Sequence, residues 1–170
     1  MRRDVAERVL TALNDASLEM NLTLVLIQEE CSDEELRKYR RGTGRAMGYL
    51  YTDVIMPILK EHPDLEPEET RERRPDDYPG PQRAERRTAP RQPDESSSRM
   101  KRHVAEQALP ALFRAAAAMN NTLLLIQKEC SEEEFLAYRE GTELAMGYLY
   151  REIIDPISRE HPDLTPEEKK

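Results

Sequence analysis

Apolar side chains recur every third or fourth residue through the first 30 positions of the chain. This spacing is typical of an α-helix that buries one face. The stripe consists of Val5, Val9, Ala12, Ala16, Met20, Thr23 and Ile27. The same spacing returns near residue 104, in a segment whose alanines and leucines favour helix. The pattern therefore predicts two long helices, at residues 4–30 and 103–129.

A second helix is predicted directly after each long one. Residues 32–35 and 131–134 match the S-x-x-E capping box, in which serine and glutamate satisfy free backbone amides at a helix start. Pro57 and Pro156 stand late in these helices and predict a kink, because proline cannot donate a backbone hydrogen bond. Neither junction contains glycine or proline. A helical hairpin is the interpretation we favour, and one continuous long helix is the alternative.

The chain contains an internal duplication. Residues 5–69 align without a gap with residues 104–168, and 40 of the 65 aligned pairs are identical. Residues 42–51, GTGRAMGYLY, return as GTELAMGYLY at residues 141–150. Small and apolar residues in this string surround the helix, and a single hairpin cannot bury all of them. We therefore predict an all-α, pseudo-twofold four-helix bundle of two hairpins, whose parallel or antiparallel direction stays open.

Charge and proline content divide the chain into three parts. Residues 1–69 form the first hairpin and carry a net charge of −6, and residues 104–170 form the second with the same net charge. Residues 70–103 carry a net charge of +4 and contain five prolines and few apolar residues. Such a segment cannot bury enough surface to offset its ordering entropy. We expect a disordered linker rich in proline and arginine.

The overall composition narrows the classes of partner and location. A net charge of −8 makes general binding to nucleic acid unfavourable. Uninterrupted apolar runs such as LVLI at residues 24–27 are far too short to cross a membrane. The chain has two cysteines and a start that does not resemble a secretion signal. We expect a cytoplasmic protein without a cofactor.

Polar residues that recur in both copies are the candidates for a ligand or partner pocket. Arg40, Thr43 and Tyr51 share one helix face by spacing, and Asn21 and Gln28 share another. The full set is Asn21, Gln28, Arg40, Thr43, Tyr51, Asn120, Gln127, Arg139, Thr142 and Tyr150. The alternative interpretation is a buried hydrogen-bonded network that fixes the register of the bundle.

Two further groups of side chains could carry chemistry. The weak candidates for a metal site are His62, Asp64, His161 and Asp163. They crowd a helix end before a proline instead of following the spacing of helical metal ligands, so a histidine that favours the helix C-terminus is the simpler interpretation. Cys31 and Cys130 stand beside acidic runs that oppose a thiolate, which favours a small buried apolar role.

None of the motifs for phosphate binding, zinc proteolysis or serine hydrolysis is present. We therefore expect a non-enzymatic protein-interaction module, such as an adaptor, a regulator or an inhibitor-like protein, that presents a helical-bundle surface. Its partner would be another protein or a further copy of itself. The alternative is a helical bundle, either a binding protein or an enzyme, that holds a small molecule or a metal at two equivalent sites.

Overall fold

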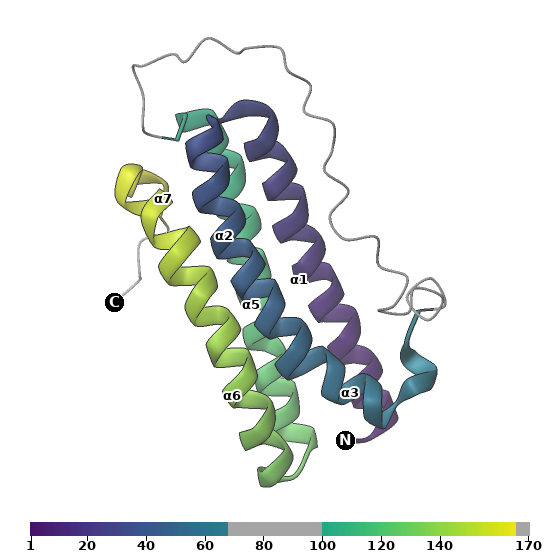
Figure 1. Ribbon diagram of the computed structural model, residues 1–170. Helices are drawn as coiled ribbons and strands as arrows, with labels where there is room; N and C mark the ends of the chain where they lie inside the picture. Colours follow the sequence, from purple (N-terminus) through teal and green to yellow (C-terminus); the bar gives the residue numbers. More distant parts are fainter. Residues whose placement is uncertain (68–99, 166–170) are drawn as a thin grey trace.

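The computed structural model describes residues 1–67 and 100–165, which form an all-α bundle (Figure 1). The first copy consists of α1 (Arg3–Glu30), α2 (Asp33–Tyr49), the π-helical turn η1 (Leu50–Ile55), α3 (Met56–Glu61) and the 3-10 turn η2 (Pro63–Leu65). The second consists of α5 (Arg102–Glu129), α6 (Glu132–Leu149), η4 (Tyr150–Ile154), α7 (Asp155–Glu160) and η5 (Pro162–Leu164).

The predicted linker, residues 70–103, lies mostly outside the described residues. Its last four residues are described, and they belong to the second copy. Met100 is buried, and α5 begins at Arg102. The boundary of the second folded unit therefore lies a few residues earlier than the sequence suggests.

Each copy is a helical hairpin, as predicted, and the continuous helix is wrong. Cys31 and Ser32 have extended backbones that end α1 and start α2. The Ser32 hydroxyl accepts from the amide of Glu35 at 3.3 Å, and Glu35 Oε2 accepts from the amide of Ser32 at 3.0 Å. The second copy has the same capping box at residues 131–134. Two extended residues and this cap reverse the chain without glycine or proline.

The two hairpins pack in antiparallel fashion, which resolves the direction that the sequence leaves open. The start of α1 meets the end of α5, where Arg2 pairs with Glu129 at 2.7 Å. Midway along the same pair of helices, Arg114 binds Glu19 with two hydrogen bonds of 3.0 and 3.1 Å. The helices α1 and α5 lie side by side over most of their length, and α2 packs against α6.

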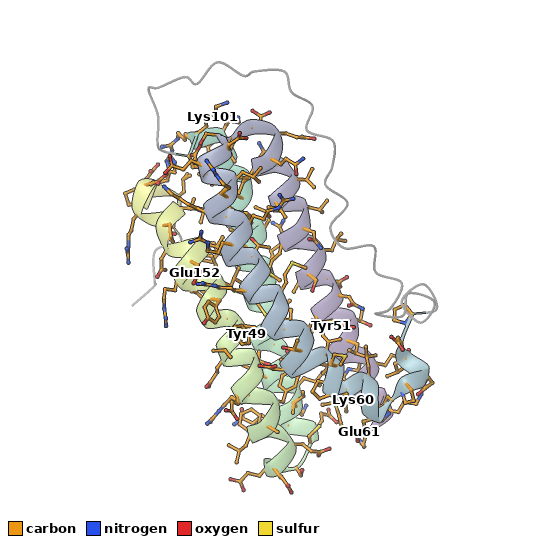
Figure 2. All side chains as sticks on the ribbon, in the orientation of Figure 1. Tyr49, Tyr51, Lys60, Glu61, Lys101 and Glu152 are labelled. Carbon is orange, nitrogen blue, oxygen red and sulfur yellow. The ribbon has the colours of Figure 1, made fainter. Side chains whose placement is uncertain are left out.

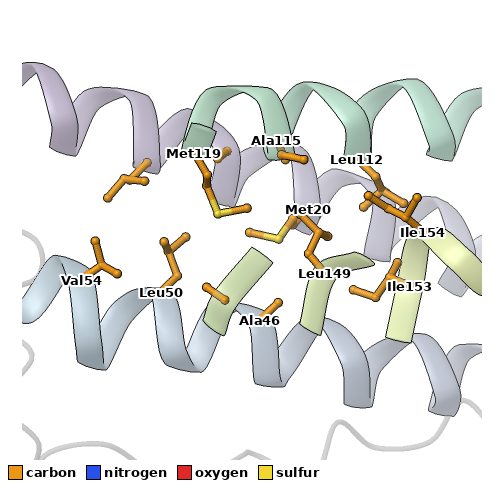
Figure 3. Packing of buried hydrophobic residues seen from close by; sticks show 14 of the residues in the cluster. Met20, Ala46, Leu50, Val54, Leu112, Ala115, Met119, Leu149, Ile153 and Ile154 are labelled. Atoms are coloured by element: carbon orange, nitrogen blue, oxygen red, sulfur yellow. The ribbon is translucent and has the colours of Figure 1, made fainter. Parts of the chain in front are cut away.

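Side chains from all four long helices meet in one core. Met20 of α1 and Met119 of α5 occupy equivalent positions in the two copies and are fully buried (Figure 3). Leu50, Leu149 and Ile153 reach the same core from the second helix of each copy. Burial of each such side chain stabilises the fold by about 1.5–3 kcal/mol. The copies therefore share a single core rather than forming two separate ones.

The late prolines are accommodated by π-helical turns. Pro57 has no amide hydrogen for the carbonyl of Asp53, four residues earlier, and its ring would crowd that carbonyl in an ordinary helix. In η1 the amide of Met56 instead bonds to the carbonyl of Tyr51, five residues back. The turn η4 makes the equivalent bond in the second copy. The wider turn gives the ring room, where the sequence predicts only a kink.

A glycine from the opposite copy packs against each π-helical turn. A Cβ atom added at Gly141 would lie 2.8 Å from the carbonyl oxygen of Asp53. One added at Gly42 would lie 3.3 Å from the carbonyl oxygen of Glu152 and 3.0 Å from its Cβ. Asp53 and Glu152 are the residues four positions before the two prolines. Each π-helical turn, formed before a proline of one copy, is thus in close contact with a glycine of the other copy. The bundle contains two such contacts, related by the pseudo-twofold axis.

The repeated string meets itself at the pseudo-twofold axis. The rings of Tyr49 and Tyr148 stack with centroids 5.0 Å apart and planes 5° from parallel. The guanidinium of Arg45 lies 5.8 Å from the centroid of the Tyr148 ring and forms an ion pair with Glu152. Tyr49 and Glu152 lie on neighbouring segments of the two copies (Figure 2). Since Tyr49 and Tyr148 are equivalent residues, this stack marks the axis that relates the copies.

One helix of the described residues, α5, is long and apolar enough to cross a membrane by length and composition alone. Its most apolar 18-residue window has a mean hydropathy of 1.3, and 44% of that window is buried inside the bundle. Its apolar residues include Leu109, Leu112 and Met119, all fully buried in the shared core. A core helix meets the same criterion, so the composition of α5 follows from its burial.

Candidate functional site

The structure buries two of the ten polar residues that the sequence marks as pocket candidates. Thr43 and Thr142 are 2% and 0% exposed. The other eight are exposed on the surface, and they are Asn21, Gln28, Arg40, Tyr51, Asn120, Gln127, Arg139 and Tyr150. Tyr51 lines a cavity described below. A joint role for the ten residues stays a prediction.

In the second copy, Thr142 belongs to a group of hydrogen-bonded side chains between α5 and α6. The Tyr138 hydroxyl donates to Thr122 Oγ1 at 2.6 Å, and Thr122 donates in turn to the carbonyl of Met119 at 2.6 Å. Thr142 donates to the carbonyl of Tyr138 at 2.9 Å. Burial raises the pKa of Tyr138 to about 12. A hydroxyl that stays neutral and paired in this way joins two helices and suits a structural role.

The first copy has the same residues with a less complete network. Thr23 donates to the carbonyl of Glu19 at 2.8 Å. The hydroxyls of Tyr39 and Thr43 are buried, and neither makes a hydrogen bond of good geometry among the residues that the structure describes, although Thr23 and Thr43 lie close enough to Tyr39 to oppose the effect of burial on its pKa. Burial raises the pKa of Tyr39, so it is also neutral at physiological pH. The two copies therefore differ in how well the same polar side chains are satisfied.

The metal candidates tie the two ends of each hairpin together. His62 Nε2 lies 2.9 Å from the carbonyl oxygen of Met1, and Asp64 accepts from Arg3 Nε at 2.8 Å. The same contacts recur in the second copy, where they are made by His161, Asp163, Met100 and Arg102. Within residues 1–67 and 100–165, no group of three or more His, Cys, Asp or Glu side chains is placed to hold a metal ion.

The two capping glutamates, Glu134 and Glu35, lie at opposite ends of the bundle and have different hydrogen-bond and ion-pair partners. At one end the Met1 ammonium pairs with Glu61 and with Glu134, which is the capping glutamate of the second copy. This ammonium, followed by the amide and hydroxyl of Ser131, lowers the pKa of Glu134 to about 2. The equivalent Glu35 has one buried oxygen, Oε1, with no hydrogen-bond partner in the described part of the chain.

The two cysteines lie at opposite ends of the antiparallel α1–α5 pair. Cys31 follows α1 and Cys130 follows α5. A helix of 28 residues is about 42 Å long, which excludes a disulfide between them within one molecule. Burial, and then the charge of Glu35, raises the pKa of Cys31 to about 11. Burial also raises the pKa of Cys130, so neither thiol is activated.

A cavity of about 250 Å³ lies in the first copy, between α1 and the segment that runs from α2 to α3. Its walls include Leu10, Asn14 and Ser17 on one side and Met47, Tyr51 and Leu59 on the other. Tyr51 is among the residues predicted from the sequence, whereas Asn14 and Ser17 are not. A signal for both exists in the repeat itself, since their equivalents are Phe113 and Ala116 in an otherwise similar segment.

An exposed apolar stripe runs along α1 of the first copy. Leu18, Leu22 and Val25 are 56%, 57% and 50% exposed, and their spacing of four and three residues places them on one helix face. The buried residues of α1, such as Met20 and Ile27, lie on the opposite face. In the second copy the equivalents are Ala117, Asn121 and Leu124. On this face, α1 therefore exposes more large apolar side chains than α5 does.

No protein-family model matches the chain, and the comparisons with curated proteins and with solved structures found no significant match.

Proposed function

We propose that the chain is a non-enzymatic protein-binding module whose first copy offers the outer face of α1 to an amphipathic helix of its partner. The observation that carries this proposal is the exposed stripe of Leu18, Leu22 and Val25. Three large apolar side chains on one face of a helix that is buried on its other face form a surface that a second helix can cover. Covering it gains about 25 cal/mol for each Å² of apolar surface removed from water.

The second copy supports a specific role for this stripe. If the stripe only reflected helix composition, the duplicated helix should carry it as well. Two of its three positions are instead Ala117 and Asn121 in α5, where less apolar surface is exposed. The first copy also carries a net charge of −6 over residues 1–69. A partner helix with basic residues beside its apolar face fits this surface best.

Photocrosslinking in the host cell tests this proposal with a matched control. We would place the photoreactive residue p-benzoylphenylalanine at Leu22 in one variant and at Asn121, the equivalent position, in another. The proposal predicts an adduct of protein size from position 22 and much less from position 121. Equal adducts from both positions, or none from position 22, would contradict it. The mass of the adduct distinguishes a further copy of this chain from a different protein.

A second substitution tests whether the stripe acts as one surface. Leu18→Glu adds a charge to the stripe without removing a core side chain, so we expect the fold to be unchanged. The crosslinked yield from position 22 should fall at least tenfold in this variant. The substitution Ala117→Glu, at the equivalent position of α5, should leave the yield unchanged. Circular dichroism of both variants checks that the helices remain intact.

A further inference from the structure

The cavity of the first copy differs from its equivalent in the second copy at a few positions. Leu10, Met47 and Tyr51 have identical counterparts 99 residues later, whereas Asn14 is replaced by Phe113. Phe113 is half-buried and packs against the shared core. A benzyl side chain therefore enters the second copy at the position where the first copy has only a short amide.

A second residue in the wall of the cavity also differs between the copies. Leu59 lines the cavity in the first copy, and its equivalent Ser158 has a buried hydroxyl without a hydrogen-bond partner among the described residues. The large side chain thus stands on α3 in the first copy and on α5 in the second. A buried serine hydroxyl at this position is consistent with an aromatic ring that covers it from the other helix. The second copy thus has a large aromatic side chain at the position where the first copy has a short amide beside a cavity.

We propose that the cavity of the first copy binds a small molecule with one aromatic ring, which occupies the space that the Phe113 ring occupies in the second copy. A cavity of about 250 Å³ has room for such a ring and one substituent, since an apolar cavity of about 150 Å³ holds benzene. The walls suit a ring chemically. Tyr51 offers an aromatic ring and Met47 offers a thioether, and both groups pack favourably against aromatic rings.

The polar residues in the wall of the cavity determine which substituent a bound ring should carry. The Ser17 hydroxyl already donates to the carbonyl of Leu13 at 2.9 Å, so it presents lone pairs to a ligand. The amide of Asn14 can both donate and accept. A ring that carries a hydroxyl or amino group one bond away satisfies both residues. Because Phe113 replaces Asn14 in the second copy, the proposal expects one such site, whereas the sequence alone suggests two equivalent sites.

Titration of the full chain with benzyl alcohol, followed by two-dimensional NMR, tests the proposal. We expect saturable shifts around Asn14 and Tyr51, with a dissociation constant on the order of 1 mM for a ligand of this size. Cyclohexylmethanol has a similar size without the aromatic ring and should bind at least fivefold more weakly. No saturable shift, or equal affinity for the two alcohols, would overturn the proposal.

The second copy provides the decisive variants. Asn14→Phe transfers the internal occupant to the first copy and should weaken binding of benzyl alcohol at least tenfold. Asn14→Ala removes the amide without filling the space and should weaken binding only a few-fold. Phe113→Asn should open a second site and raise the stoichiometry from one to two. Unchanged binding in Asn14→Phe would refute the proposal even if Phe113→Asn fails to fold.

This inference is independent of the protein-binding role. Leu18→Glu alters the exposed stripe and leaves the residues of the cavity in place. It should therefore keep the affinity for benzyl alcohol while losing the crosslinked partner. Asn14→Phe is the reciprocal variant and should keep the crosslinked adduct from position 22. The two proposals can therefore fail separately.

Discussion

Alanine substitutions at the glycines of the repeated string should have opposite effects that depend on what each glycine faces. Gly141 lies against the π-helical turn of the first copy, where an added Cβ would stand 2.8 Å from the carbonyl oxygen of Asp53. Gly147 stands in the same helix, and no atom lies within 4 Å of an added Cβ. The pair therefore compares the same chemical change with and without a close neighbour.

The expected magnitudes follow from two opposing terms. Alanine improves helix propensity over glycine by about 0.5–1 kcal/mol at either position. Overpacking against backbone costs about 1–3 kcal/mol, and it applies to Gly141 alone. Gly147→Ala should therefore stabilise the fold by about 0.5–1 kcal/mol, and Gly141→Ala should destabilise it by about 1–2 kcal/mol. In the first copy, Gly48→Ala and Gly42→Ala should show the same contrast.

Urea denaturation followed by far-UV circular dichroism measures these differences directly. The two variants should differ by about 1.5–3 kcal/mol, so at about 2–4 °C for each kcal/mol in a chain of this size their thermal midpoints should differ by roughly 3–12 °C. The loss at Gly42 should be the smaller of the two, because an added Cβ there would lie 3.3 Å from the nearest backbone oxygen, that of Glu152, instead of 2.8 Å. Equal stability of Gly141→Ala and Gly147→Ala would refute the close contact between the copies.

Three further predictions concern titratable and buried side chains. Tyr138→Phe removes a hydrogen bond of 2.6 Å and should destabilise the fold by about 1 kcal/mol. Tyr39→Phe should cost less than Tyr138→Phe by urea denaturation, because the Tyr39 hydroxyl makes no hydrogen bond of comparable geometry among the described residues. The folded-state pKa of Glu134 is lowered to about 2, so its charge stabilises the fold above its unfolded pKa of about 4.3. That contribution is lost as the pH falls toward 2, and Glu134→Gln should flatten this part of an acid-denaturation curve. In thiol labelling with Ellman's reagent at pH 8, Cys130 should react before the more deeply buried Cys31, and both should react much faster in denaturant.

Much of the local structure could be predicted from the sequence because local rules control it. The stripe of the first helix predicts residues 4–30, and α1 spans Arg3–Glu30. The capping box at Ser32 marks the start of α2. Apolar stripes, however, show which face of a helix is buried and not which helix covers it. The long antiparallel contact between α1 and α5 therefore required the structure.

The resolution of the proline strain could not be predicted from the residues before Pro57 and Pro156. Both a kink and a π-helical turn relieve the missing hydrogen bond, and the choice depends on the helix packed alongside. Here the glycine that permits the close approach belongs to the other copy, 84 residues from Pro57 in one case and 114 residues from Pro156 in the other. Contacts of this kind depend on tertiary structure, which a pattern within one helix does not contain.

The candidate site was predicted less well than the fold, for a related reason. The predicted pocket residues are polar side chains that the two copies share. Most of them, such as Arg40 and Asn120, lie exposed on the surface. The cavity and the apolar stripe arise where the copies differ, at Asn14 and Leu22. A duplicated chain keeps in common what its shared core requires. The positions that distinguish its halves are therefore the better guide to surface chemistry.

The covalent connection of the two hairpins changes how the bundle responds to its own abundance. Hairpins on separate chains would come apart on dilution, and similar hairpins in the same cell could exchange between pairs. In this protein the start of α1 and the end of α5 belong to one molecule, so their association does not depend on protein concentration. The thermal midpoint should accordingly be the same at any concentration of a monomeric chain. A partner or ligand therefore meets a complete bundle even when few copies are present.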